Sequence, residues 1–149
     1  MTIDPNINYG KKLIRFGILL FMMGLITGFI IPLLENPRMG LSSHLEGTLN
    51  GMLLVIIGLI WSRLDLNEKL YQWCYRLALF GTFSNWLTTL IAAVWGAGKE
   101  MMPISGGSFQ GTVWQEVLIK FGLISLSISM LVVCVILLFG LKKNTSKVK

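Results

Sequence analysis

The single histidine of the chain, His44, lies near the start of an apolar segment long enough to span a membrane. A titratable side chain is costly in hydrocarbon, so a histidine in such a segment usually faces a bundle interior or a water-filled cavity. Neutral imidazole is also a common protein ligand for haem iron and for other metals. His44 is therefore the first candidate for a metal-ligating and cofactor-binding residue.

Two further polar residues follow in the same segment. Glu46 and Asn50 are four residues apart, so a helix would bring their side chains within hydrogen-bonding reach of each other. Glu46 also has a simpler explanation, because a carboxylate near a helix N-terminus is stabilised by the helix dipole. A histidine, a carboxylate and an amide within seven residues make this segment the predicted location of the chemistry.

His44 heads a stripe of glycines. At about 100° per residue, Gly47, Gly51 and Gly58 fall on the same face of a helix as His44. Glycines spaced by four residues let a second helix or a flat ligand approach the backbone closely. Helix–helix packing explains the glycines taken alone. With a histidine at the head of the stripe, we favour a planar macrocycle held along Gly47 and Gly51.

A third apolar segment carries Asn85. An unpaired amide in a low-dielectric core costs several kcal/mol, so Asn85 needs a partner. Asn50 or a bound ligand could supply it, and a structural and a functional role both stay open. Asn50 and Asn85 are the candidate catalytic residues.

Four apolar segments must position these side chains, near residues 13–34, 44–61, 70–95 and 117–141. Each is long enough to cross about 30 Å of hydrocarbon as a helix. Charged residues make up 13% of the chain, against roughly 25% in soluble domains. We therefore predict an all-α fold, an integral membrane four-helix bundle forming a single domain over residues 1–149. The first segment is too long for the apolar core of a signal peptide, so we expect it to stay as a membrane helix.

Most basic residues flank the two termini and the second connection, where they include Lys11, Lys12, Lys142, Lys143 and Arg63. The positive-inside rule then predicts that both termini are cytoplasmic and that the start of the second helix lies on the opposite side. This placement accounts for the net charge of +6, and we expect no nucleic-acid partner.

Several activities do not fit these residues. A bis-histidine electron-transfer cytochrome needs two imidazoles per site, and the chain has one histidine. A small multidrug transporter needs a carboxylate within its first membrane helix, and a hydrolase of the G-x-S-x-G type needs that motif; the sequence has neither. A metal cofactor with one protein ligand and an open coordination position remains, which suits Lewis-acid or oxygen-atom chemistry.

Three motifs carry a resemblance to a known family. The motifs His44–Met52, Leu79–Trp86 and Gly111–Glu116 resemble the small four-helix membrane proteins of the hydroxylaminobenzene mutase family, and the similarity extends over about residues 13–141. More distantly, the chain resembles styrene oxide isomerase, with which it shares a histidine and an asparagine six residues apart. The glycine-rich connection between residues 96 and 116 is long enough to cover a site.

The isomerase resemblance implies a homotrimer that holds haem b (iron) between subunits. It further implies that His44 is the axial ligand, that ferric iron acts as a Lewis acid, and that Asn50 orients the substrate. The isomerase has a tyrosine in its third helix, four residues after an asparagine. The corresponding position here, counted from Asn85, is Thr89, and this departure favours the mutase branch.

The mutase branch implies redox-neutral intramolecular oxygen transfer that converts hydroxylaminobenzene into 2-aminophenol. The implied partners are an apolar aromatic substrate and the lipid bilayer, and the implied location is the bacterial inner membrane as a multi-pass protein. Two alternatives stay open. One is an aryl epoxide isomerase that forms an aldehyde, and the other is a non-catalytic haem-binding or structural membrane protein.

Overall fold

The computed structural model describes residues 5–145 and, over that range, contains helices and no strands. Lys147 and Lys149, and the side chains of Lys142 and Lys143, lie outside the described part. The all-α prediction is confirmed. In chain order the elements are α1 (Pro5–Ile30), η1 (Ile31–Leu33), α2 (Pro37–Ile60), η2 (Trp61–Arg63), α3 (Glu68–Trp95), α4 (Pro103–Gly106) and α5 (Val113–Thr145).

Four helical stretches are long and apolar enough to cross a membrane: Asn8–Leu33, Pro37–Arg63, Glu68–Trp95 and Val113–Leu141. Their outward faces carry large apolar side chains, and Phe29 at 85% exposure is an example. A soluble protein would not leave so much apolar surface in water, whereas lipid tails accommodate it. The predicted membrane fold with four spanning helices is confirmed.

The second membrane helix begins earlier than the sequence suggested. We expected a start near residue 44, but α2 begins at Pro37, where the side chain of Asn36 accepts a hydrogen bond from the Met39 N–H at 3.2 Å. Asparagine is a favoured N-cap, and proline suits the first helical position because its missing N–H would be unpaired there. His44 therefore lies about two turns inside α2, roughly 10 Å along the helix axis.

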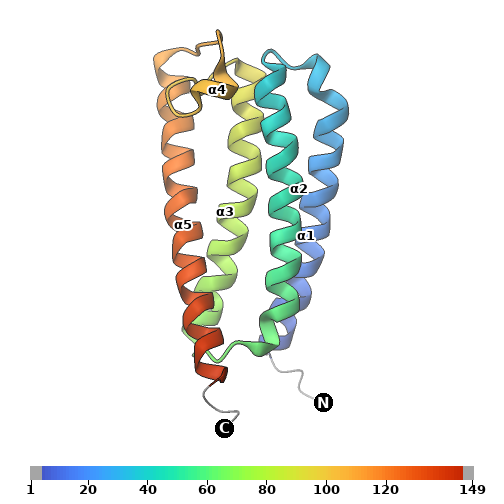
Figure 1. The fold of residues 1–149 in the computed structure, drawn as a ribbon, viewed down its shortest axis with the longest axis vertical. Helices are drawn as coiled ribbons and strands as arrows, with labels where there is room; N and C mark the ends of the chain where they lie inside the picture. The colour runs from blue at the N-terminus through green and yellow to red at the C-terminus, as the bar shows by residue number, and fades with distance from the viewer. Residues whose placement is uncertain (1–4, 146–149) are drawn as a thin grey trace.

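The four long helices stand side by side in the order α1, α2, α3, α5, and both described ends of the chain lie at the same end of the molecule (Figure 1). The helix α1 packs mainly on α2, and α3 packs on α2 and less extensively on α1. Among the long helices of the described part, α5 contacts α3 alone. The arrangement is therefore an open row of helices rather than a closed square, and α4 lies at the opposite end of the row (Figure 1).

Glycines bring α1 and α2 into backbone contact. A Cβ atom at Gly47 would lie 2.5 Å from the Cα of Gly24, and one at Gly51 would lie 2.5 Å from the backbone nitrogen of Phe21. Real Cβ atoms do not approach backbone atoms this closely, so the contact requires glycine on α2. Helix packing, the alternative that the sequence left open, accounts for Gly47 and Gly51 within one protomer.

Two apolar clusters fill the interior at the two ends of the row. One contains Leu54, Ile57 and Trp61 near the end of α2, and the other contains Met39 near its start. The polar residues of α2 lie between these clusters, over residues 43–50. The fold thus places a polar layer inside the membrane-spanning region, and a polar layer in hydrocarbon is a functional-site candidate.

Candidate functional site

The ring of His44 is oriented by α1. Its Nδ1 lies 2.8 Å from the carbonyl oxygen of Gly24, and since a carbonyl only accepts hydrogen bonds, Nδ1 carries the proton and the lone pair is on Nε2. Within the described part of the chain, no hydrogen bond to Nε2 is found. A Cβ at Gly28 would lie 2.9 Å from Nδ1, so the absence of a side chain there makes room for the ring. Metal-binding histidines have this arrangement, with the second nitrogen bonded to a backbone carbonyl.

Glu46 joins the two candidate asparagines. Its Oε2 accepts one hydrogen bond from the Asn50 amide at 3.0 Å and another from the Asn85 amide at 2.5 Å. The expected contact between Glu46 and Asn50 is present. The partner of Asn85 is this carboxylate and not Asn50, because α3 crosses α2 at that level. Glu46 does not cap the helix, since the first turn of α2 contains no acidic residue.

His44 and the Glu46 cluster point to different sides of α2. Side chains two positions apart in a helix point about 200° away from each other. Accordingly, His44 forms a hydrogen bond with α1, whereas Glu46 forms one with α3. Trp86 lies between them, because its Cδ1 would be 2.8 Å from a Cβ at Gly47 and its Nε1 donates to the hydroxyl of Thr27 on α1 at 3.0 Å. Within one protomer, His44 and Asn50 therefore do not face a common space.

An apolar groove lies on the His44 side of α2. It has a volume of about 280 Å³ and is lined by Ile18, Phe21, Gly51, Met52, Val55 and Ile56. Gly51 is seven residues after His44, so the two share a face about two turns apart. Gly51 is buried and its backbone packs against α1, and the groove borders it on the outer side of this contact.

Thr89 is directed into its own helix. It is 2% exposed, and its hydroxyl donates to the carbonyl oxygens of Asn85 at 2.9 Å and Trp86 at 3.0 Å. Ser43 of α2 donates to the same Trp86 carbonyl at 3.1 Å. These hydrogen bonds fix the backbone beside Asn85, and they leave no hydroxyl proton at Thr89 for a ligand.

Glu116 organises the connection that covers the end of the row, a role that we did not predict. Its Oε1 accepts hydrogen bonds from the N–H groups of Gly98 at 2.9 Å and Gly111 at 3.0 Å, and its Oε2 accepts from Glu100 at 3.3 Å. The side chain is 3% exposed. The sequence signal that could have identified Glu116 is a carboxylate at the start of a long apolar segment, directly after a glycine-rich connection.

Replacing Glu116 with glutamine is expected to destabilise the protein by about 2 kcal/mol, because hydrogen bonds to a charged group contribute roughly 1.5–3 kcal/mol. A glutamine keeps one acceptor oxygen and turns an N–H toward the remaining donor. We expect a lower Tm in detergent and faster amide hydrogen exchange at Gly98, Glu100 and Gly111.

The matched control is Glu100→Gln, which removes a carboxylate that forms only a half-exposed ion pair with Lys120 at 3.6 Å. Exposed pairs contribute about 0–1 kcal/mol. Equal Tm values for the two variants would contradict the role given to Glu116.

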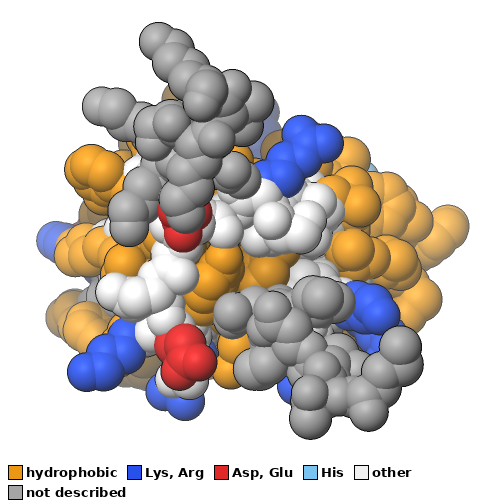
Figure 2. All heavy atoms as spheres, turned by 90° about the horizontal axis from the view of Figure 1, so that it is seen from below, with side chains coloured by type: hydrophobic (Ala, Val, Ile, Leu, Met, Phe, Trp, Pro, Cys, Tyr) orange, Lys and Arg blue, Asp and Glu red, His pale blue; other side chains and the backbone are white. Residues whose placement is uncertain are grey.

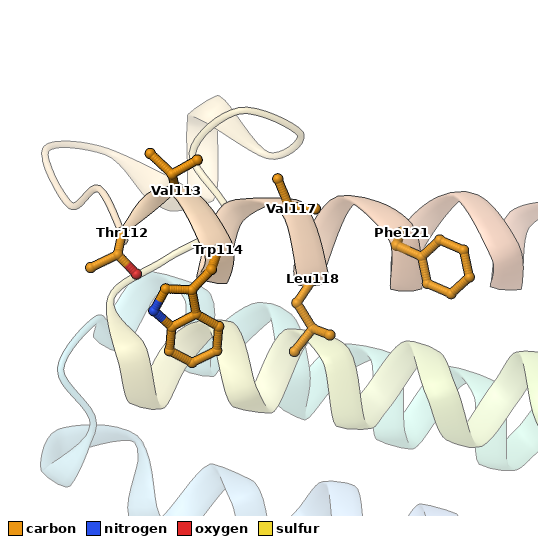
Figure 3. Close-up of a pocket in the computed structure, with 6 residues that line it drawn as sticks. All are labelled: Thr112, Val113, Trp114, Val117, Leu118 and Phe121. Atoms are coloured by element: carbon orange, nitrogen blue, oxygen red, sulfur yellow. The ribbon is translucent and has the colours of Figure 1, made fainter.

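The connection also meets an open hollow on the outside of α5. This hollow has a volume of about 840 Å³, and its lining residues follow the first turns of the helix (Figure 3). Trp114 stacks edge-to-face on Trp95, with ring centroids 5.0 Å apart, and is 59% exposed. Trp114 lines this hollow, and its side chain points from α5 toward α3 (Figure 3).

Comparison with known proteins agrees with these features. A family model described as styrene oxide isomerase matches residues 9–142. Hydroxylaminobenzene mutase HabB of Ectopseudomonas oleovorans is 54% identical over 137 residues, which cover 92% of this chain and 84% of the relative. Hydroxylaminobenzene mutase HabA of the same organism is 42% identical over 125 residues, which cover 84% of this chain and 93% of the relative. No solved structure gives a significant match.

Proposed function

The chain belongs to the styrene oxide isomerase family, and from this membership we propose that it is a haem-dependent membrane mutase of aryl hydroxylamines. Membership makes the chain an isomerase. The proposed reaction converts hydroxylaminobenzene into 2-aminophenol, and the two similar proteins that carry the mutase name support this substrate over an epoxide.

The hydrogen bond from His44 Nδ1 to the Gly24 carbonyl carries the cofactor proposal. It presents the Nε2 lone pair, which is the atom that would ligate iron. Residues 5–145 contain no group of three or more His, Cys, Asp or Glu side chains that could hold a metal ion. A haem needs no such group, because the macrocycle supplies four ligands itself, so the donor set fits haem b. When bound, its iron would supply a Lewis acid for the substrate oxygen.

The position of the asparagines supports a site shared between protomers. His44 faces α1, on the side of α2 that also carries the groove at Gly51, whereas Asn50 and Asn85 meet on the α3 side of α2. A groove of about 280 Å³ is also smaller than the roughly 300–1,000 Å³ of usual ligand pockets. We therefore propose a homotrimer in which haem lies between subunits, with His44 from one protomer and the amides from its neighbour.

The side chains have distinct tasks in this reaction. An aryl hydroxylamine partitions into the bilayer, and Asn50 and Asn85 hold its polar end. The N–O bond breaks and a C–O bond forms at the ortho carbon, while the ring loses one proton and the nitrogen gains one, so no oxidant or reductant is needed. The surrounding apolar side chains exclude water, which would otherwise capture the electron-deficient ring.

A second candidate, aryl epoxide isomerisation to an aldehyde, is supported by the description of the matching family model. The position of Thr89 argues against it. At this place a hydroxyl could donate to an epoxide oxygen, but the Thr89 proton is bonded within α3. The mutase proposal is therefore preferred.

The test uses purified protein in detergent. We expect a Soret band and conversion of phenylhydroxylamine into 2-aminophenol. In isotopically labelled water the product should contain no labelled oxygen, because the oxygen moves within one molecule. Labelled product would indicate attack by water instead, and a wild-type preparation with no Soret band would contradict the haem assignment.

The proposed location is the bacterial inner membrane, with both termini in the cytoplasm. Lys and Arg side chains gather around the end of the molecule at which both described ends of the chain lie (Figure 2). Lys11, Lys12 and Arg15 at this end are exposed. Such residues favour the cytoplasmic side, which puts His44 and Glu46 in the half of the membrane away from the cytoplasm.

A further inference from the structure

The Glu46 cluster removes an ambiguity that asparagine side chains normally have. An amide donates from its nitrogen and accepts at its oxygen, and a 180° rotation exchanges the two. Here the Nδ2 atoms of Asn50 and Asn85 both donate to Glu46 Oε2. A carboxylate oxygen that accepts two N–H groups is itself an acceptor, so each amide must turn its nitrogen toward Glu46 and its Oδ1 away.

The amide oxygens that result have no partner among the described residues of the chain. In the described part of the chain, neither Asn50 Oδ1 nor Asn85 Oδ1 accepts a hydrogen bond, and neither is among the completely buried atoms without a partner. The same holds for Glu46 Oε1. One cluster therefore presents three oxygen acceptors in the membrane-spanning region, where water does not compete well for them.

From this geometry we infer that Glu46 is a positioning residue, which fixes both amides so that the site selects aromatic ligands with N–H or O–H donors. The inference rests on the proposed function, in which Asn50 and Asn85 hold the polar end of the substrate. It assigns to the site a recognition rule that depends on Glu46.

The rule distinguishes the two candidate substrates. An aryl hydroxylamine has an N–H and an O–H, and 2-aminophenol also has donors on both substituents. An aryl epoxide has one acceptor oxygen and no donor. A site built of acceptors would leave those acceptors unpaired beside an epoxide, and sites of this kind discriminate strongly against a ligand that lacks the matching group.

The experiment compares two unreactive probes that differ only by methylation of the nitrogen, aniline with two N–H donors and N,N-dimethylaniline with none. Their affinities are measured by protection of the purified protein against thermal unfolding, a readout that does not require turnover. We expect the wild type to bind aniline about tenfold more tightly, as one or two new hydrogen bonds would give. Glu100→Gln, at an exposed carboxylate outside the cluster, should keep this ratio.

Variants at Glu46 separate positioning from direct chemistry. Glu46→Leu frees both amides to rotate, and the affinity ratio should fall to about one. Glu46→Gln should keep most of the ratio and of the mutase activity, because its single amide oxygen can still accept both N–H groups. Asn85→Leu removes one oriented amide and should lower the ratio to about threefold. It provides the test if Glu46→Leu does not fold.

The outcomes test the positioning role of Glu46, its direct participation in the reaction and the mutase proposal separately. A wild-type ratio in Glu46→Leu, or in Asn85→Leu where that variant replaces it, would overturn the inference even if the wild type makes 2-aminophenol. A Glu46→Gln variant as inactive as Glu46→Leu would show that the carboxylate itself reacts and is not a positioning residue. A wild type that binds aniline more tightly but makes no 2-aminophenol would contradict the mutase proposal and still support the recognition rule.

Discussion

Replacing His44 with alanine is expected to give a folded protein that contains no haem and rearranges aryl hydroxylamines at least about 100-fold more slowly. The proposal makes this imidazole the protein's sole ligand to iron, and loss of a partner outside the ligand shell already costs roughly 10–100-fold in affinity or activity. The substitution removes one hydrogen bond, to Gly24, so the effect on folding should be small by comparison. The absorption spectrum and the initial rate check the prediction.

Two further variants make this result specific. His44→Gly leaves space for a free imidazole, and added imidazole should restore both the Soret band and part of the rate. Thr48→Ala is the matched control, because the Thr48 hydroxyl bonds to the backbone of α2 itself, at 3.1 Å from the His44 carbonyl. A His44→Ala protein with an unchanged Soret band would assign the iron to another ligand.

Local sequence patterns predicted the membrane helices and those contacts of the site that lie within one helix. Each apolar run had the length of a membrane span, and the spacing of four between Glu46 and Asn50 foretold their hydrogen bond. Both inferences depend on a single helix, in which geometry follows directly from residue separation. The start of α2 after Asn36 was harder to predict, because Asn-Pro after an apolar run fits the end of one helix as well as the start of the next.

Contacts between distant segments were not predictable in the same way. The Asn85 amide reaches Glu46 across 39 residues of sequence, and Glu116 binds the backbone of Gly98 across 18. The sequence does not indicate which faces of α2 and α3 pack together. It also does not indicate that the connection between α3 and α5 folds back over the start of α5. The polar type of these residues showed only that each needed a partner.

The division of the site also emerged only from packing. His44 and Asn50 are close in sequence, and the resemblance implied a shared ligand, but in one protomer they face different neighbours, α1 and α3. The glycine stripe explains the difference. Because Gly47 and Gly51 both bring α1 against α2, that face of α2 is closed by α1, and the apolar groove lies beside this contact at Gly51.

The same contact leads to the largest expected effect on stability, that of Gly47→Ala. The added Cβ would lie 2.5 Å from the Gly24 Cα and 3.0 Å from its backbone nitrogen, and backbone atoms cannot rotate away as a side chain can. The two helices must separate, and overpacking of this kind costs about 1–3 kcal/mol and occasionally more. We expect a loss of about 3 kcal/mol, measured by reversible unfolding in mixed micelles.

A glycine that faces a side chain provides the control. A Cβ at Gly122 of α5 would lie 2.8 Å from the Thr88 hydroxyl and 3.0 Å from its Cγ2. These are side-chain atoms, which can move farther than the backbone of a packed helix, so Gly122→Ala should cost less than Gly47→Ala. Gly47→Ala should also lower haem content, because the Gly24 carbonyl that orients His44 belongs to the residue that the new methyl group displaces. If Gly47→Ala were as stable as Gly122→Ala and kept its haem, close packing of α1 on α2 would not be what positions the histidine.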